Sequence, residues 1–331
     1  MRPVALLLAV VALVSPARAQ SYGNTFVFEY AVRNAQGSVD QVAAQVLDRA
    51  KTSGFAVLAE STPGIPAACG FESRVLSLFD ATYASALVAA QSGTAAFAAV
   101  DRINVFSDEE GVHVAYVNPL GVNRTVLLDD TGFTATSRSH RDKLRQVITS
   151  SVTGDPSDRG FGPERDRGYI GRTMGVMAGG PFNEKVQILS AAAGADLAGV
   201  LTKLRSSLSR PGPQWGIKLV YDQAMPGGKT HVLGLSGRAM ESKSFEIVQA
   251  GSDGARKHLT CPGVAHAAAY PLELVVIERN GGVDVVLVDA MYRMKMYFED
   301  AGKWAFMKNM GMPGSIADEI RTAVRAALAS N

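Results

Sequence analysis

An internal repeat sets the strongest limit on how this chain can fold. Val75-Leu76-Ser77-Leu78 is matched later by Val232-Leu233-Gly234-Leu235, and Gly111 to Asn118 is matched by Gly282 to Asp289. Strand-like and helix-like patterns recur around these matches in the same order in both halves. Two copies of one supersecondary unit, each burying its own core, are therefore predicted.

Each copy begins with a strand and an amphipathic helix. The strands are expected at Phe26 to Val32 and at Val186 to Ser190. Ser38 and Gln41 form a capping-box pattern at the start of the first helix. Pro211 ends the second helix, because proline cannot continue a helical hydrogen-bond ladder. Two further strands and another helix are expected after these in each half.

A β-hairpin and a closing helix complete each copy. The hairpins are expected at Arg102 to Ser107 with Gly111 to Asn118, and at Leu272 to Glu278 with Val283 to Asp289. The last helix is expected to begin at Ser315. Because hairpin strands are antiparallel and helices are mixed among them, the predicted fold class is α+β. It consists of two tandem repeats of a small mixed or antiparallel sheet packed with helices.

Composition marks the expected boundaries. The first module is expected at residues 20–150 and the second at 185–331, with a methionine-rich stretch at 291–312. Residues 151–184 are rich in Gly, Pro, Arg and Asp and have little apolar periodicity. This composition predicts a linker or an ordered surface loop between the modules.

Several short stretches point to a known family. They are the helix Ser38 to Ser53, Val75 to Asp80, the strand ending Tyr116-Val117-Asn118-Pro119, and Ala269 to Val276 before the second hairpin. In these stretches and in the order of its elements, the chain resembles the "domain of unknown function 302" family. The resemblance implies a compact α+β module in two tandem copies. It implies no reaction and no catalytic residue, and the second copy departs from the pattern at Asp289-Ala290.

The first residues have the pattern of a signal peptide. Arg2 is a short positive region, Val4 to Val14 is an apolar run, and Ala17-Arg18-Ala19 is a small-residue cleavage site. We expect cleavage after Ala19 and a periplasmic or secreted protein. Loss of Arg2 and Arg18 leaves 31 basic against 31 acidic residues. This balance gives no long-range attraction to nucleic acid, and no later apolar run is long enough to span a membrane.

Two cysteines, Cys69 and Cys261, are the only ones in the chain. In an oxidising compartment, a disulfide between the two halves is the simplest interpretation. Two free buried thiols are an alternative. A thiol-dependent enzyme is the third, and it would need Cys261 close to His266 with Cys69 unpaired.

Motifs of common enzyme classes are absent from the sequence. There is no glycine-rich phosphate loop, no H-E-x-x-H, no paired C-x-x-C and no G-x-S-x-G. Ser236 in Gly234-Leu235-Ser236-Gly237 is interpreted as part of a turn at a strand end. His113 has Asp284 at the matching place in the second copy, which predicts a solvent-facing position. The protein is therefore not expected to be an enzyme.

Methionine is concentrated in the second copy, in two M-x-x-M-x-M patterns. They comprise Met291, Met294, Met296, Met307, Met310 and Met312. Thioether sulfur is a soft ligand for Cu(I), and methionine is also a common filler of irregular cores. If Val283 to Glu299 were one strand, Met294 and Met296 would lie on its apolar face and Met291 on the other. A Cu(I) site would then combine Met294 and Met296 with Met310 or Met312, the latter in a loop.

These observations predict an exported, soluble ligand-binding or accessory protein of the cell envelope. Cu(I), bound by the clustered methionines, is the most specific candidate ligand. The alternative is a protein–protein or apolar-ligand interaction module that uses the groove between the two copies, with purely structural methionines.

Overall fold

The computed structural model describes residues 23–91, 93–173, 178–251 and 256–329. The predicted signal peptide lies outside these ranges. The first module contains the elements that the repeat predicted and three short helices. They are β1 (Thr25–Arg33), α1 (Val39–Thr52), β2 (Ala56–Ser61), β3 (Ser73–Phe79), α2 (Ala81–Ala90), η1 (Ala95–Ala98), β4 (Val100–Asp108), β5 (Gly111–Val117), α3 (Pro119–Val126), η2 (Thr131–Phe133) and α4 (Thr134–Thr149).

The second module repeats this order of strands and helices and adds one short helix, α8, near its end. Its elements are β10 (Val186–Ala193), α5 (Leu197–Leu208), β11 (Lys218–Ala224), β12 (Thr230–Ser236), α6 (Arg238–Gly251), η4 (Pro262–Ala269), β13 (Leu272–Arg279), β14 (Gly282–Val288), α7 (Ala290–Phe298), η5 (Glu299–Ala301), α8 (Lys303–Lys308) and α9 (Gly311–Ala329).

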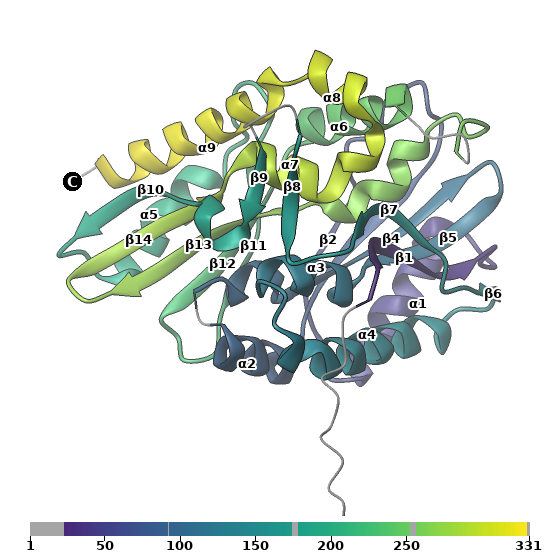
Figure 1. The fold of residues 1–331 in the computed structure, drawn as a ribbon, viewed down its shortest axis with the longest axis horizontal. Helices are drawn as coiled ribbons and strands as arrows, with labels where there is room; N and C mark the ends of the chain where they lie inside the picture. The colour runs from purple at the N-terminus through teal and green to yellow at the C-terminus, as the bar shows by residue number, and fades with distance from the viewer. Residues whose placement is uncertain (1–22, 92, 174–177, 252–255, 330–331) are drawn as a thin grey trace, which may run out of the picture.

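The two sheets share one topology. Their orders are β2-β3-β4-β5-β1 and β11-β12-β13-β14-β10, and all neighbouring strands are antiparallel. In Figure 1, the helices α1, α2 and α4 lie along the lower side of the molecule, and α6, α8 and α9 lie along the upper side. The α+β fold class with two repeated halves is thus confirmed.

Local sequence explains where the first helix begins. The Ser38 side chain accepts a hydrogen bond from the backbone N–H of Gln41, and the Gln41 side chain accepts one from the backbone N–H of Ser38. This capping box satisfies backbone donors that the helix itself leaves without partners. The apolar stripe of the same helix, including Val42 and Val46, is buried against the sheet.

The segment predicted as a linker or surface loop contains strands instead. They are β6 (Asp155–Pro156), β7 (Gly160–Arg165), β8 (Tyr169–Thr173) and β9 (Ala178–Pro181), followed by η3 (Phe182–Lys185). Strands β6 and β7 pair antiparallel with β1 and extend the first sheet, while β8 and β9 pair with each other. These strands are too short and too rich in glycine to show an apolar alternation. Their partner strand, rather than their own pattern, determines their conformation.

Both faces of the first sheet are covered, each by a different module. Helices α1 and α4 cover one face, where Leu76, Ile103 and Val105 join their apolar stripes. The other face packs against η4 of the second module. In return, η1 of the first module contacts β12 and β13. The two modules therefore exchange equivalent short helices, as the halves of a symmetric dimer would.

An ion pair is buried at this junction. Arg102 on β4 and Glu273 on β13 occupy equivalent positions, each nine residues before the glycine that opens the next strand. The Arg102 guanidinium, 2% exposed, pairs with the Glu273 carboxylate and donates to the Pro271 carbonyl at 2.9 Å. Arg293 also donates to Glu273, at 2.9 Å. Burial alone would raise the pKa of Glu273, but the two guanidinium groups lower that pKa below its ordinary value.

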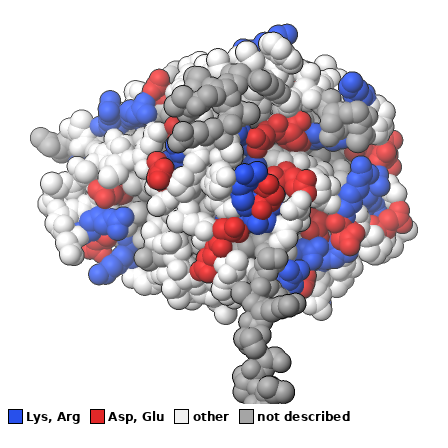
Figure 2. Space-filling model, viewed as in Figure 1, with Lys and Arg blue, Asp and Glu red and all other residues white. Residues whose placement is uncertain are grey.

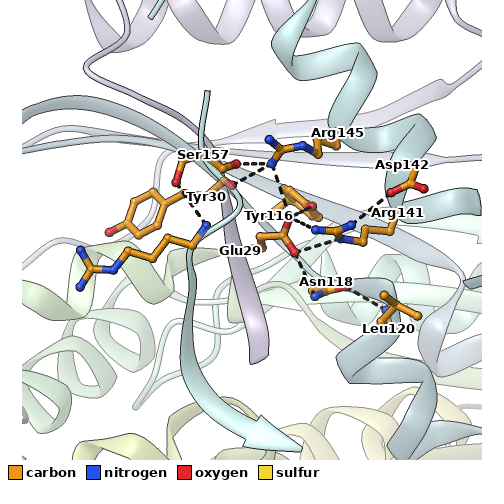
Figure 3. Close-up of polar contacts among 10 residues, drawn as sticks. Glu29, Tyr30, Tyr116, Asn118, Leu120, Arg141, Asp142, Arg145 and Ser157 are labelled. Carbon is orange, nitrogen blue, oxygen red and sulfur yellow. Dashed lines mark hydrogen bonds and ion pairs between the residues drawn. The ribbon is translucent and has the colours of Figure 1, made fainter. Parts of the chain in front are cut away.

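A second buried carboxylate fixes α4 to β1. Glu29 accepts hydrogen bonds from the Tyr116 hydroxyl at 2.7 Å, from the Asn118 amide at 3.2 Å and from Arg141 at 2.5 and 2.9 Å (Figure 3). Arg145 lies 3.5 Å from the same carboxylate and also donates to the Ser157 carbonyl (Figure 3). A buried charge is tolerated only with such partners, so this network determines how α4 sits against the sheet.

A disulfide joins the modules covalently. Cys69, in the segment between β2 and β3, is bonded to Cys261, directly before η4. The bond therefore holds η4 beside the first module, where it covers the first sheet.

One face of the surface shows no concentration of one charge. On the face in Figure 2, basic and acidic side chains are interspersed. None of the described helices has the length and hydropathy needed to cross a membrane.

We predict that Arg102→Ala lowers the free energy of unfolding by about 3 kcal/mol or more, because it leaves Glu273 short of a buried partner. Urea unfolding followed by circular dichroism measures this change. The control is Arg321→Ala, which removes a surface pair with Asp318 and should cost less than about 1 kcal/mol. Equal losses in the two variants would show that the buried pair is not important for stability.

Candidate functional site

The methionine-rich stretch is helical, which corrects the strand expected from Val283 to Glu299. Strand β14 ends at Val288. Asp289 then caps α7, because its carboxylate accepts a hydrogen bond from the Tyr292 backbone N–H at 2.8 Å. Apolar residues recur after Val288 at both the strand period and the helix period. The sequence pattern alone therefore did not distinguish a strand from a helix. Met312, expected in a loop, lies in the first turn of α9.

The six methionines do not share one environment. Met294 and Met296 are both buried, but residues two apart on a helix point about 200° apart around its axis. Met312 is buried, Met291 and Met307 are half-buried, and Met310 is 38% exposed. The strand argument that placed Met294 and Met296 on one face is therefore wrong.

A small cavity shows how Met294 packs. The cavity has a volume of about 30 Å³, and its lining includes Met240, Met294, Pro313 and Ile316. It lies between the last hairpin of the second module and the helices α7 and α9. Flexible thioether side chains suit such an irregular junction, so this environment favours the interpretation of Met294 as a core filler.

Cysteine and histidine do not form the arrangement that a thiol enzyme would need. Both cysteine sulfurs are in the disulfide, and no free cysteine remains. His266 is fully buried against the rings of Phe28 and Phe161, and its Nε2 lies 2.9 Å from Asp300 Oδ2. The structure therefore offers no thiolate for His266 to activate.

His113 is fully buried, so the prediction of a solvent-facing position is wrong. The rings of Tyr30 and Phe106 cover it, at centroid distances of 5.9 and 5.4 Å. Matching a histidine to an aspartate indicated a polar position, but polarity does not require exposure when a hydrogen-bond partner is present.

His113 also belongs to a cluster with Asp108 and Glu110, whose ligand atoms lie within 4.8 Å of one another. However, His113 Nδ1 accepts a hydrogen bond from the Asn34 backbone N–H at 3.3 Å, so Nε2 carries the proton and donates to Asp108 at 2.9 Å. Glu110 pairs with Arg33. These contacts already occupy the ligand atoms, and the cluster is explained as part of the hairpin structure.

A groove is present where the edge strands β2 and β11 of the two sheets meet. We name it the inter-module groove; its volume is about 760 Å³. The first module contributes the end of β2 and the residues after it. The second contributes the segment before β11, β11 itself and the start of α6. Its lining residues are Ala59, Glu60, Ser61, Thr62, Pro211, Gly212, Pro213, Gln214, Gly216, Lys218, Leu219, Val220, Ser236, Gly237, Arg238, Ala239 and Glu241.

The groove contains two cationic side chains and the start of a helix. Lys218 and Arg238 are exposed in it, and neither forms an ion pair within the described parts of the chain. Gly237 precedes α6 at the position where Asp80 caps α2 in the first module. Glycine has no side chain to cap the helix, so the first backbone N–H groups of α6 lack the carboxylate that α2 has. Glu60, also in the lining, lies 4.0 Å from Arg74.

A buried acid lies at the bottom of this groove. Glu241 accepts a hydrogen bond from the Ser236 hydroxyl and another from the Gly64 backbone N–H at 2.6 Å, so it also connects the two modules. Burial raises the pKa of Glu241 above its ordinary value, which favours the protonated, neutral form.

Sequence reasoning missed Lys218, Arg238 and Glu241, and it treated Ser236 only as part of a turn. The groove is built from segments far apart in the chain, so no local motif marks it. The one sequence signal was the change from Asp80 to Gly237 between the two repeats.

Comparison with known proteins gives little further information. No family model matches the chain, and no curated protein matches it. Among solved structures, the chain is similar to one described as the uncharacterized conserved protein DUF302 from Bacillus stearothermophilus. The identity is 9%, the TM-score is 0.32, and the match covers 36% of this chain and 95% of the other.

Glu241 should make stability depend on pH. Because its pKa is higher in the folded than in the unfolded protein, the protonated group stabilises the fold. This contribution is complete below the unfolded pKa, about 4.3, and is lost as pH rises through the raised native pKa. Relative to Glu241→Gln, the wild type should therefore lose melting temperature between pH 4 and pH 8. Glu278→Gln, at an exposed position, is the control, and parallel curves for wild type and Glu241→Gln would contradict this prediction.

Met294 and Met296 should behave as core residues. We expect Met294→Leu and Met296→Leu each to cost less than about 1.5 kcal/mol, because the side-chain volume is nearly conserved. Titration with Cu(I) against a competing chelator should give the same affinity for the wild type and for a variant with Met294, Met296, Met310 and Met312 all changed to Leu. A loss of affinity in that variant would instead support the copper site expected from the sequence.

Proposed function

We propose that this protein is an exported binding protein whose inter-module groove holds a small anionic ligand. One observation carries the proposal. The groove places Lys218 and Arg238, without ion-pair partners in the described chain, beside the start of α6. A carboxylate or phosphate group is the chemistry that such a site binds best, because cationic side chains and a helix N-terminus attract negative charge together.

The charge distribution in the rest of the protein favours binding of an anion in the groove. Basic and acidic residues balance in the predicted mature chain, and both signs are interspersed on the face in Figure 2. An anion would therefore be drawn to the groove rather than to the surface in general. The Thr62 side chain in the lining adds a hydroxyl group that can donate to a ligand oxygen.

Two features support export. The N-terminal sequence has the order of charge, apolar run and small residues that signal peptides have. The Cys69–Cys261 disulfide suits an oxidising compartment, where such bonds persist.

We predict that the protein binds citrate or inorganic phosphate, measured by isothermal titration calorimetry in low salt. The double variant Lys218→Ala/Arg238→Ala should lose at least about tenfold in affinity, since charge-assisted hydrogen bonds contribute roughly 1.5–3 kcal/mol each. The matched control is Arg138→Ala/Lys229→Ala, two exposed basic residues outside the groove, which should bind like the wild type. Absence of binding to either anion, or equal affinity in both double variants, would contradict the proposal.

A further inference from the structure

The first strands of the two modules are equivalent residue by residue. Strand β1 pairs with β5 and β10 pairs with β14, and each pairing contains a bulge at the same place. Tyr30, just before the first bulge, pairs with Ala115; Ile188, just before the second, pairs with Val286. Tyr30 and Ile188 therefore occupy the same position in the repeat.

The outer edge of β1 is covered by a strand that lies outside the repeated unit. Strand β7 pairs antiparallel with β1, with Phe161 opposite Phe28. The Tyr30 backbone N–H donates to the Arg159 carbonyl at 3.0 Å, and the Phe161 ring lies 4.7 Å from the Tyr30 ring. Arg145 holds the chain leading into β7 through the Ser157 carbonyl, as Figure 3 shows. The first module thus contains a bound peptide strand with an aromatic residue, supplied by its own chain.

The equivalent edge of the second module has no such strand. Within the described residues, β10 pairs only with β14. Ile188, which occupies the position of Tyr30, is 61% exposed. Its neighbours Gln187 and Ala191 are exposed as well.

Apart from the bulge, which β1 also has while it pairs with β6 and β7, the edge lacks the features that usually prevent strand pairing. Val186 to Ala193 contains no proline and no charged residue. Exposed edge strands in soluble proteins are normally protected by such residues, by a covering element or by extreme shortness. Eight residues are enough to form a ladder with an added strand.

We propose that the outer edge of β10 is a docking site for an extended peptide segment of a partner protein, which adds antiparallel to β10 and places an aromatic side chain over Ile188. The first module shows the fit, because the chain from β6 to the start of β7 pairs with residues 28–33 of β1, which are the counterparts of residues 186–191 in β10. A second copy of this chain is a poorer occupant, since β10 contains no aromatic residue to cover Ile188.

The probe is a labelled synthetic peptide with the sequence of residues 155–165, which includes β6, β7 and Phe161. Fluorescence polarisation should show saturable binding to the full chain. Ile188→Asp should weaken this binding at least tenfold, and the same peptide with Phe161→Ala should also bind more weakly. Trp304→Ala, which removes another highly exposed apolar side chain on α8, is the matched control and should bind like the wild type.

Hydrogen exchange of the backbone amides identifies where on the protein the peptide binds. Protection on binding should appear in residues 186–193, because the edge of β1 is already occupied by β7. Three results would overturn the proposal: no saturable binding, protection outside β10, or self-association of the wild type that Ile188→Asp abolishes. The last result would assign the edge to a second copy of the chain.

Discussion

The buried ion pair between Arg102 and Glu273 requires the two halves of this chain to differ. The residues occupy equivalent positions in the repeat, and each lies where the modules meet. Two identical copies would place like charges together there, which is strongly unfavourable in a buried environment. These two positions can both carry a charge at the junction because one copy has the base and the other has the acid. The positions of η1, η4 and the inter-module groove all depend on how the two modules meet.

A second pair of equivalent positions shows the same exchange of side-chain types between the two modules. In the first module the Asn118 amide donates to the Glu29 carboxylate at 3.2 Å. At the equivalent positions of the second, the Gln187 amide donates to the Asp289 carboxylate at 2.9 Å, so acid and amide have exchanged strands. Other changes are not reciprocal. Gly237 replaces the capping Asp80, and only β1 is covered by a further strand. These unmatched differences give the second module an uncapped helix start at the groove and an open sheet edge.

The sequence was a reliable guide where local patterns and tertiary contacts agree. The capping box at Ser38, the hairpins around Gly111 and Gly282, and the repeated order of elements are all present in the structure. The prediction of secondary structure from apolar periodicity failed after Val288, where the spacing of apolar residues fits both a strand and a helix. It also failed in β7, where pairing with a partner strand determines the conformation. The burial of His113 could not be seen either, because it depends on rings contributed by other strands.

By itself, the sequence determined that this chain consists of two α+β units, because helix and strand periods and turn residues act over a few residues. It also identified the only two cysteines that could be paired. Only the tertiary structure decided which faces of the two sheets meet, how Lys218, Arg238 and Glu241 come together, and which sheet edge is left open. The meeting of the two modules and the inter-module groove depend on contacts between residues more than a hundred positions apart, such as Gly64 and Glu241. Burial, which shifts the pKa of a side chain, depends on the same contacts.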